Sequence, residues 1–208
     1  MRELPAPDSR AEKRLGAEMS FPRFTTRYQT EDQAYTGVEL RPHFLLERFR
    51  IQGSALCAFV GACRVETAEL VDWEDRLALD RIEAKSMIHF IGEFFGMSLR
   101  EGVLLQRLVM AIMRDELQAS APAEVITRDG DDLFTRERKL SVSIVTASPV
   151  SILLHVGINV DPAGAPVPAI GLAELGVAYA PWIERVLRRV SQEWDSMDWA
   201  CVKVRPVM

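Results

Sequence analysis

A long amphipathic segment, followed at once by closely spaced strand segments, constrains the fold of this chain more than any other feature. Between residues 99 and 118 the apolar side chains recur every three or four positions, which predicts a helix with one buried face. Beyond residue 120 come four short segments of strand composition with turn residues between them. The helix face is formed by Leu104, Leu105, Leu108, Val109, Ile112 and Met113, and the strand segments are 124–128, 132–136, 139–146 and 151–160.

The rest of the chain mixes strand-like and helical patterns. After Ser86, a candidate N-cap, apolar residues at i, i+3, i+4, i+7 and i+8 predict a short helix. Strands paired as hairpins, with helices between groups of strands, predict an α+β fold with a mixed, largely antiparallel sheet flanked by helices. The further predicted elements are strands at 45–51, 55–65 and 199–207, helices at 86–95 and 181–197, and an acid-rich loop at 71–85.

The size and charge of the chain limit its function. At 208 residues, 48% of them hydrophobic, the sequence predicts one domain over residues 26–208, preceded by a flexible tail over residues 1–25. A net charge of −5 argues against nucleic acid or an anionic membrane as a partner and favours small molecules or proteins. The N-terminus lacks the apolar stretch of a signal peptide, and no segment has the ~18 uninterrupted apolar residues of a membrane span.

The cysteines favour a reducing, cytoplasmic location. They number three and include no CxxC pair, which makes a secreted disulfide framework improbable. Each of Cys57, Cys63 and Cys201 is expected to be a buried small residue rather than a nucleophile.

The histidines and the acid-rich loop are weak candidates for a site. His43, His89 and His155 lack the spacing of a zinc site. His89 and Glu93 lie four residues apart on the predicted helix, where a surface pair is favoured over an acid–base couple. The acids of residues 72–75 either bind a metal or form a solvated loop, and the solvated loop is favoured.

Residues 128–161 carry the polar side chains that a phosphate-handling site needs. Asp131 and Asp132 stand where a strand begins, and carboxylate oxygens are the ligands that magnesium prefers. Lys139, at the start of the facing strand, supplies a positive charge for a phosphate or for an adduct of carboxylate and phosphate. Asn159 adds an amide oxygen for the metal or a donor for a phosphate. The alternative, which composition alone favours, is a turn with solvated acids, a surface lysine and a capping asparagine.

The segment from the long helix through "APAEVITRDGDDLFTRERKLSVSI" to "LLHVGINVD" resembles the central catalytic segment of the biotin and lipoate protein ligases. Their fold is shared with class II aminoacyl-tRNA synthetases. The resemblance places Arg128, Asp131 and Asp132 on the first lysine, the asparagine and the aspartate of a Lys-Trp-Pro-Asn-Asp-Leu-Tyr type motif. It places Lys139 on the lysine that contacts the acid and the adenylate, and Asn159 on the asparagine of a Gly-Ile-Asn-Val type strand.

Over nearly its whole length, the chain is similar to a mainly archaeal family known as domain of unknown function 366, which has the same ligase-like fold. The segments that carry this similarity include "YTGVELRPH", "VGACRV", "MIHFIGEFF", "GDDLF", "KLSVSIVTASPVS" and "HVGINVD". Val142 stands where the ligases have a glycine three residues after the lysine. The glycine-rich and arginine-rich loops with which the ligases wrap the adenylate are absent, and "FVGACRV", with Arg64, is the candidate to replace them.

These resemblances imply an enzyme that activates a carboxylic acid with ATP and Mg²⁺ and passes the acyl group to an acceptor such as a carrier protein. Lys139 would then be the catalytic residue, which stabilises negative charge on the acid and the α-phosphate. The alternative, favoured by the missing loops, is a non-catalytic protein on the same fold that binds a small anion or a nucleotide. A homodimer is compatible with both. The residues implied to bind the ligands are Arg64, Arg128, Asp131, Asp132 and Asn159, the last three of them also through magnesium.

Overall fold

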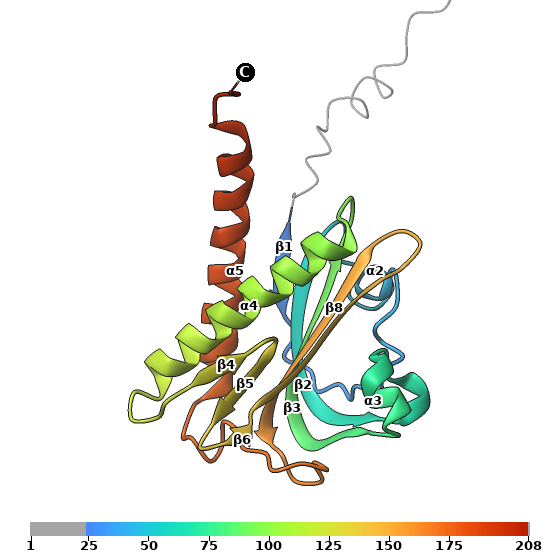
Figure 1. The fold of residues 1–208 in the computed structure, drawn as a ribbon, viewed down its shortest axis with the longest axis vertical. Helices are drawn as coiled ribbons and strands as arrows, with labels where there is room; N and C mark the ends of the chain where they lie inside the picture. The colour runs from blue at the N-terminus through green and yellow to red at the C-terminus, as the bar shows by residue number, and fades with distance from the viewer. Residues whose placement is uncertain (1–23, 208) are drawn as a thin grey trace, which may run out of the picture.

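Two β-sheets and two long helices make up the fold (Figure 1). The structure is a computed structural model that describes residues 24–207. The strands are β1 (Thr25–Tyr28), β2 (Ala55–Val65), β3 (Ile82–Phe94), β4 (Thr127–Asp129), β5 (Asp132–Thr135), β6 (Arg138–Lys139), β7 (Ser141–Ala147) and β8 (Ile152–Asp161). The helices are α2 (Phe44–Phe49), α3 (Trp73–Leu77), α4 (Leu99–Ser120) and α5 (Tyr179–Val202), with a 3-10 turn at Thr67–Glu69.

The main sheet has the strand order β1-β2-β3-β8-β7, and the smaller sheet has the order β4-β5-β6. Strand β1 runs parallel to β2, whereas all the other neighbouring strands are antiparallel. The α+β fold predicted from the sequence, with a largely antiparallel sheet flanked by helices, is confirmed.

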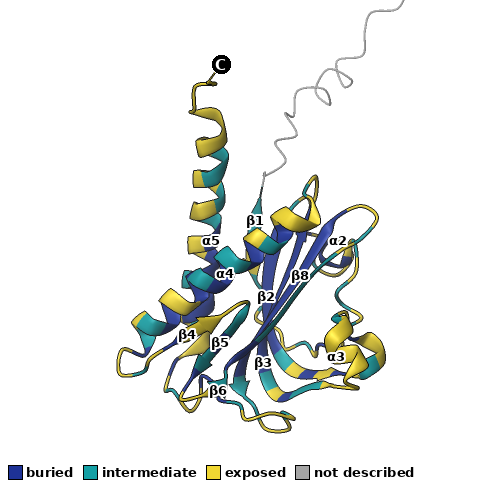
Figure 2. Ribbon diagram, in the orientation of Figure 1, coloured by how far each residue is buried: buried dark blue, intermediate teal, exposed yellow. Residues whose placement is uncertain are grey.

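Both faces of the main sheet are covered, which explains why its central strands are apolar almost throughout. Helices α4 and α5 cover one face, where they pack against side chains such as Leu56 and Val156. Helix α2 and the segment around Tyr35 cover the other face, where Cys57 and Phe59 lie. Figure 2 shows the resulting buried centre along β2, β3 and β8.

Helices α4 and α5 lie where the sequence predicts them. A capping box begins α4: the Ser98 hydroxyl accepts a hydrogen bond from the Glu101 backbone N–H, and the Glu101 carboxylate accepts one from the Ser98 backbone N–H. Gly102 lets α4 approach the sheet, because a Cβ there would lie 2.5 Å from a methyl carbon of Ile152. The predicted buried face of α4 includes one error, since Leu104 is 61% exposed.

Aromatic stacking fixes the first described residue to the domain. Phe24 stacks on Trp194 of α5, with ring centroids 4.4 Å apart, and on Phe94 of β3 at 6.1 Å. Regular structure begins at Thr25, one residue before the predicted start of the domain. Residues 1–23 of the predicted tail lie outside the described residues.

The helix predicted over residues 86–95 is wrong, because this segment belongs to strand β3. Every residue in the range Met87–Phe94 is buried, since β3 lies in the middle of a sheet that is covered on both faces. Such a run has no polar side, so its apolar spacing fits a helix as well as a strand. The predicted surface pair also fails: His89 and Glu93 are both buried, and Glu93 accepts hydrogen bonds from the His43 backbone N–H and the Ser151 hydroxyl.

Three other predicted segments are wrong. Residues 45–51, predicted to be extended, lie mostly in helix α2. The predicted loop over 71–85 contains helix α3 and the start of β3. The predicted strand over 199–207 is the last turn of α5 followed by residues without regular structure.

Two observations bear on the remaining expectations. Cys57 and Cys63 are buried as predicted, but Cys201 is exposed near the end of α5. None of the helices within residues 24–207 is long and apolar enough to cross a membrane.

Strands follow α4 as predicted, and they position the polar stretch of residues 128–161. The strand predicted over 139–146 is divided, because Lys139 belongs to β6 in the small sheet and Ser141–Ala147 form β7 in the main sheet, and the strand predicted over 124–128 begins only at Thr127. Strands β4 and β5 form a hairpin through Gly130, which has a left-handed φ of 57°. The next turn, between β5 and β6, is formed by Arg136 and Glu137, with φ values of 50° and 58°. Strand β7 then pairs with β8 in the main sheet. The polar residues of this stretch therefore lie where the two sheets meet.

Candidate functional site

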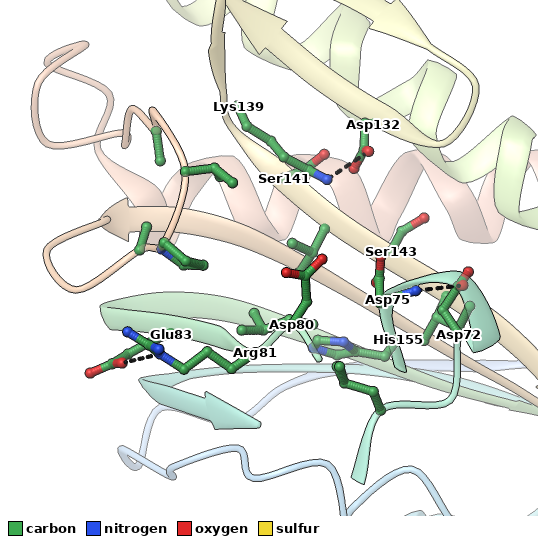
Figure 3. A pocket seen from close by; sticks show the side chains of 18 of the residues that line it. Asp72, Asp75, Asp80, Arg81, Glu83, Asp132, Lys139, Ser141, Ser143 and His155 are labelled. Carbon is green, nitrogen blue, oxygen red and sulfur yellow. Dashed lines mark hydrogen bonds and ion pairs between the residues drawn. The ribbon is translucent and has the colours of Figure 1, made fainter. Parts of the chain in front are cut away.

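A cavity of about 260 Å³ lies beside the junction of the two sheets (Figure 3). Its walls come from the connection between β2 and β3, the first half of β3, the β4–β5 turn, strands β5 to β8, and the segment 165–169. This volume is slightly below the ~300–1,000 Å³ that is typical of ligand pockets, so it fits a compact ligand or part of a larger one. The polar lining residues are Asp72, Asp75, Asp80, Arg81, Glu83, Asp131, Asp132, Lys139, Ser141, Ser143, His155 and Asn159.

Lys139 and Asp132 form an ion pair on the cavity wall. The Lys139 Nζ lies 2.8 Å from an Asp132 carboxylate oxygen, and both side chains are about 30% exposed. They face each other because they sit on the neighbouring strands β5 and β6 (Figure 3). Burial raises the pKa of Asp132, and the hydrogen bond from Lys139 opposes that shift. The structure thus brings together the predicted lysine and one predicted aspartate.

The backbone of Lys139 is held on both sides. Its N–H donates to the Pro168 carbonyl at 2.9 Å, and its carbonyl accepts a hydrogen bond from the Ile170 N–H at 3.0 Å. Next along the chain, the Leu140 N–H donates to the Leu133 carbonyl. The ammonium group is therefore carried by a short strand that neighbouring segments fix in place.

Asp131, the neighbour of Asp132, is tied to α4 and β7. One carboxylate oxygen accepts a hydrogen bond from Arg107 at 2.9 Å, and the other accepts one from the Gln106 amide at 2.8 Å. The Ser143 hydroxyl lies 3.1 Å from the second oxygen and from the Asp131 carbonyl. Both carboxylate oxygens thus have partners within the protein, and these bonds fix the β4–β5 turn against α4.

Asn159 lies on the cavity wall and is only 6% exposed. Its side-chain N–H donates to the Lys139 carbonyl at 3.3 Å, and its backbone N–H donates to the Leu140 carbonyl. Its amide oxygen has no hydrogen-bond partner among the described residues. Two positions earlier on β8, a Cβ on Gly157 would lie 2.3 Å from the Met87 sulfur, so the glycine leaves room for that side chain against the sheet.

Arg64 and Arg128, two of the predicted ligand-binding residues, do not line the cavity. Arg64 pairs with Glu66 on the surface at 2.8 Å, and its side chain is 73% exposed. The Arg128 side chain is exposed on β4 and donates to the Gly130 carbonyl.

The connection between β2 and β3 brings Asp72, Asp75 and Asp80 to the cavity, whereas the sequence favours a solvated loop for the first two and does not single out Asp80. Asp72 caps α3 by accepting hydrogen bonds from the Glu74 and Asp75 backbone N–H groups. Asp75 faces the cavity from α3, and Asp80 follows shortly after that helix (Figure 3). Partial burial raises the pKa of Asp75, Asp72 raises it further, and Lys139 opposes the shift.

A second feature that sequence reasoning missed is a buried histidine pair. The His155 Nε2 lies 3.1 Å from the His89 Nδ1, and the Tyr35 ring stacks on His155 with centroids 3.9 Å apart. Burial lowers the pKa of His89 to about 3 and the pKa of His155 well below its usual value, so both rings are neutral. His155 also lines the cavity, where its Nδ1 has no hydrogen-bond partner among the described residues. A lone histidine within the apolar run of β8 was the available signal.

The residues of the cavity suit a magnesium ion that is bound mainly through nucleotide phosphates. Among residues 24–207, no three histidine, cysteine, aspartate or glutamate side chains lie together in a way that could hold a metal ion. Magnesium that is bound through nucleotide phosphates needs only one or two protein carboxylates. Asp132 lines the cavity and could serve as one, whereas the oxygens of Asp131 already accept hydrogen bonds from Arg107 and Gln106.

Comparison with known proteins identifies the family. The family model described as Domain of unknown function (DUF366) matches residues 24–205. The chain belongs to this family. An uncharacterized protein of Methanocaldococcus jannaschii is 32% identical over 208 residues, which are 93% of this chain and 92% of that protein. A protein of unknown function from Pyrococcus horikoshi is 34% identical, with a TM-score of 0.84 over 89% of this chain and 100% of that one.

More distant structures share the fold alone. The biotin protein ligase from Aquifex aeolicus, in complex with biotin and ATP, has a TM-score of 0.53 and 16% identity, over 80% of this chain and 69% of that one. This likeness confirms the fold that the sequence resemblance implied for this DUF366 member.

Proposed function

We propose that this DUF366 protein is an ATP-dependent ligase of the biotin/lipoate type, which activates a carboxylic acid and passes the acyl group to an acceptor. The observation that carries the proposal is the Lys139 ammonium group, fixed beside Asp132 on the wall of a cavity of about 260 Å³. The fold adds support, since the Aquifex aeolicus protein that shares it is a biotin protein ligase in complex with biotin and ATP.

In the proposed first step, a carboxylate oxygen of the acid forms a bond to the α-phosphorus of ATP. The bond from that phosphorus to the bridging oxygen breaks, and pyrophosphate leaves with the electron pair. Negative charge builds on the α-phosphate oxygens in the transition state, and a fixed ammonium group such as that of Lys139 stabilises it. In the second step, the acceptor nucleophile attacks the acyl carbon and AMP leaves.

The other cavity residues have distinct proposed roles. Asp132 orients the Lys139 ammonium group and offers a carboxylate oxygen to magnesium, which supplies neutralising charge to the phosphates when bound. Asn159 offers its unpartnered amide oxygen to a ligand or to that ion. Asp131 is better suited to positioning, because its hydrogen bonds hold the hairpin against α4. Arg64 and Arg128 face solvent, so any contact with a phosphate lies outside the cavity.

The second candidate function is a binding protein without catalysis. The modest volume of the cavity favours it, because about 260 Å³ leaves little room for an acid and ATP together without opening. In that case Lys139 holds a small anion, and no nucleotide is consumed.

Acid-dependent exchange of pyrophosphate into ATP tests the proposal, because it reports formation of the acyl adenylate alone. The purified protein is incubated with ATP, Mg²⁺, labelled pyrophosphate and a panel of carboxylic acids. At least one acid is expected to support exchange that vanishes without Mg²⁺. If no acid does so, and mass spectrometry of the purified protein finds only an unactivated acid, the binding function is correct instead.

A further inference from the structure

The cavity holds more negative charge than its own cations balance. Six carboxylates and two cations line it. Asp131, Asp132 and Glu83 are each paired with a lysine or an arginine. Asp72 uses one oxygen to cap α3. Asp75 and Asp80 remain, and neither carboxylate has a hydrogen-bond or ion-pair partner among the described residues.

The two unpaired carboxylates share the cavity with the Lys139–Asp132 pair. Asp75 comes from α3 and Asp132 from β5, yet Lys139 acts on both. Burial raises the pKa of each carboxyl group, Lys139 opposes that shift in each, and Asp75 raises the pKa of Asp132 further. Figure 3 shows Asp75 and Asp80 on the side of the cavity that lies across from Lys139. A ligand that touches Lys139 at one end therefore meets unpaired carboxylates at the other.

The cavity wall adds two buried side chains that also lack a partner at one polar atom. Asn159 is 6% exposed, and its amide oxygen accepts no hydrogen bond from the described residues. His155 is 2% exposed, and Nε2 is its only ring nitrogen with a partner, the Nδ1 of His89. Its ring is neutral, so it does not repel a cation. The Asn159 amide oxygen is not one of the fully buried polar atoms without a partner, so it is open to the cavity, where a ligand can donate a hydrogen bond to it.

An apolar ligand end does not suit this region, because it would take the Asp75 and Asp80 carboxylates out of water without compensation. A metal ion held by the protein alone does not suit it either, since no three metal-binding side chains converge among residues 24–207. An ammonium group does suit it, because it carries one positive charge and three hydrogen-bond donors.

We propose that the acid bound in this cavity carries a protonated amino group at the end opposite its carboxylate, with Asp75 and Asp80 as the receptors of that group and the Asn159 amide oxygen as a further acceptor on the cavity wall. Lys139 receives the carboxylate. The substrate class is thus a compact amino acid with separated charges rather than an acid with an apolar tail. This inference rests on the proposed function for the carboxylate end only.

Matched pairs of acids test the inference, since an ammonium group and a methyl group have nearly the same size. Binding of 5-aminopentanoate and of hexanoate is measured by calorimetry without ATP, and 4-aminobutanoate and 6-aminohexanoate are compared with pentanoate and heptanoate. In the best pair, the amino acid is expected to bind at least about tenfold more tightly. The inference is overturned if the alkyl acid of each pair binds equally well, or if no member of the panel binds.

Two variants locate the effect. Asp75→Asn and Asp80→Asn are each expected to reduce the preference for the amino acid, while Glu74→Gln, on α3 but outside the cavity lining, keeps it. Titration with Mg²⁺ alone provides the other control. If Mg²⁺ binds without nucleotide and removes the preference, the carboxylates are a metal site and the inference is wrong.

Failure of this inference differs from failure of the ligase proposal. If amino acids bind and no acid of any kind supports pyrophosphate exchange, the ligase is refuted and the ammonium site is supported. Exchange with an alkyl acid alone would support the ligase and refute the ammonium site.

Discussion

Replacing Lys139 with alanine is expected to impair catalysis far more than folding. The Lys139–Asp132 pair is about 30% exposed on both sides, and partly exposed pairs of this kind contribute about 1 kcal/mol or less. A domain with ~5–15 kcal/mol of stability tolerates that loss. For a chain of 208 residues it corresponds to a fall in Tm of roughly 2–4 °C.

The expected catalytic loss is larger because the Lys139 ammonium group neutralises charge that exists only in the transition state. Removal of one such fixed donor typically slows catalysis by about 100- to 1,000-fold, or ~2.7–4 kcal/mol of barrier height. Lys139→Arg is expected to restore only part of the rate, because a planar guanidinium does not occupy the position of a compact ammonium.

The assay is acid-dependent pyrophosphate exchange, together with a thermal melt of each variant. Lys85→Ala is the control, since Lys85 forms an ion pair of nearly the same length with Asp161, at 2.9 Å, but its side chain is 73% exposed and lies outside the cavity lining. The reasoning is refuted if Lys139→Ala and Lys85→Ala retain the same exchange rate. A Tm loss far above that of Lys85→Ala would instead assign Lys139 a structural role.

Three further predictions concern stability. Phe94→Ala is expected to lower the free energy of unfolding, measured by urea denaturation, by ~3–5 kcal/mol, because Phe94 is 2% exposed. Phe95→Ala, at a position that is 39% exposed, should lower it far less, and equal losses in the two variants would contradict the burial of Phe94. Asp131→Ala should lower the free energy of unfolding by ~1–3 kcal/mol, since it leaves the buried Gln106 amide without its carboxylate partner. An unchanged denaturation midpoint would refute this prediction. Burial holds the pKa of His89 and His155 in the folded state below the unfolded value, so the unfolded chain binds more protons at acidic pH. The free energy of unfolding should therefore fall as the pH drops below ~6.5, by up to ~1.4 kcal/mol per pH unit for each histidine. Unfolding curves at pH 7, 6 and 5 measure this loss, which should shrink in His89→Phe.

The sequence predicts the fold best where one face of an element is polar. Helices α4 and α5 each have a buried and an exposed side, so their spacing identifies them. The hairpin strands after α4 are recognised by their turn residues. Strand β3 fails because both its faces are covered by other parts of the chain, which removes the polar positions that distinguish a strand from a helix.

Within the cavity, the sequence predicts the residues that are close together along the chain and not those that come from distant segments. Asp132 and Lys139 are close in sequence and pair across a hairpin, so local reasoning places them together. Asp75 and Asp80 reach the cavity from a connection that precedes the hairpin by about fifty residues, and the sequence of that connection favours a solvated loop over a site. Contacts between segments so far apart in the sequence depend on how the β2–β3 connection packs against the rest of the domain, and the residues of the connection alone do not predict that packing.

Asp131 and Asp132 show that residue type and sequence position do not by themselves decide the role of a carboxylate in a site. Asp131 and Asp132 are adjacent at the start of β5, and the resemblance to the ligases assigns both to magnesium and phosphates. In the folded chain, Arg107 and Gln106 of α4 take the Asp131 oxygens, while Asp132 turns to Lys139. The partners that decide between a positioning residue and a ligand-binding residue thus come from α4, which precedes the short motif that contains the two aspartates. The Asp131 carboxylate forms a charge-assisted hydrogen bond to Arg107, which is stronger than the bond a neutral amide could form there, so a carboxylate suits the positioning role at position 131.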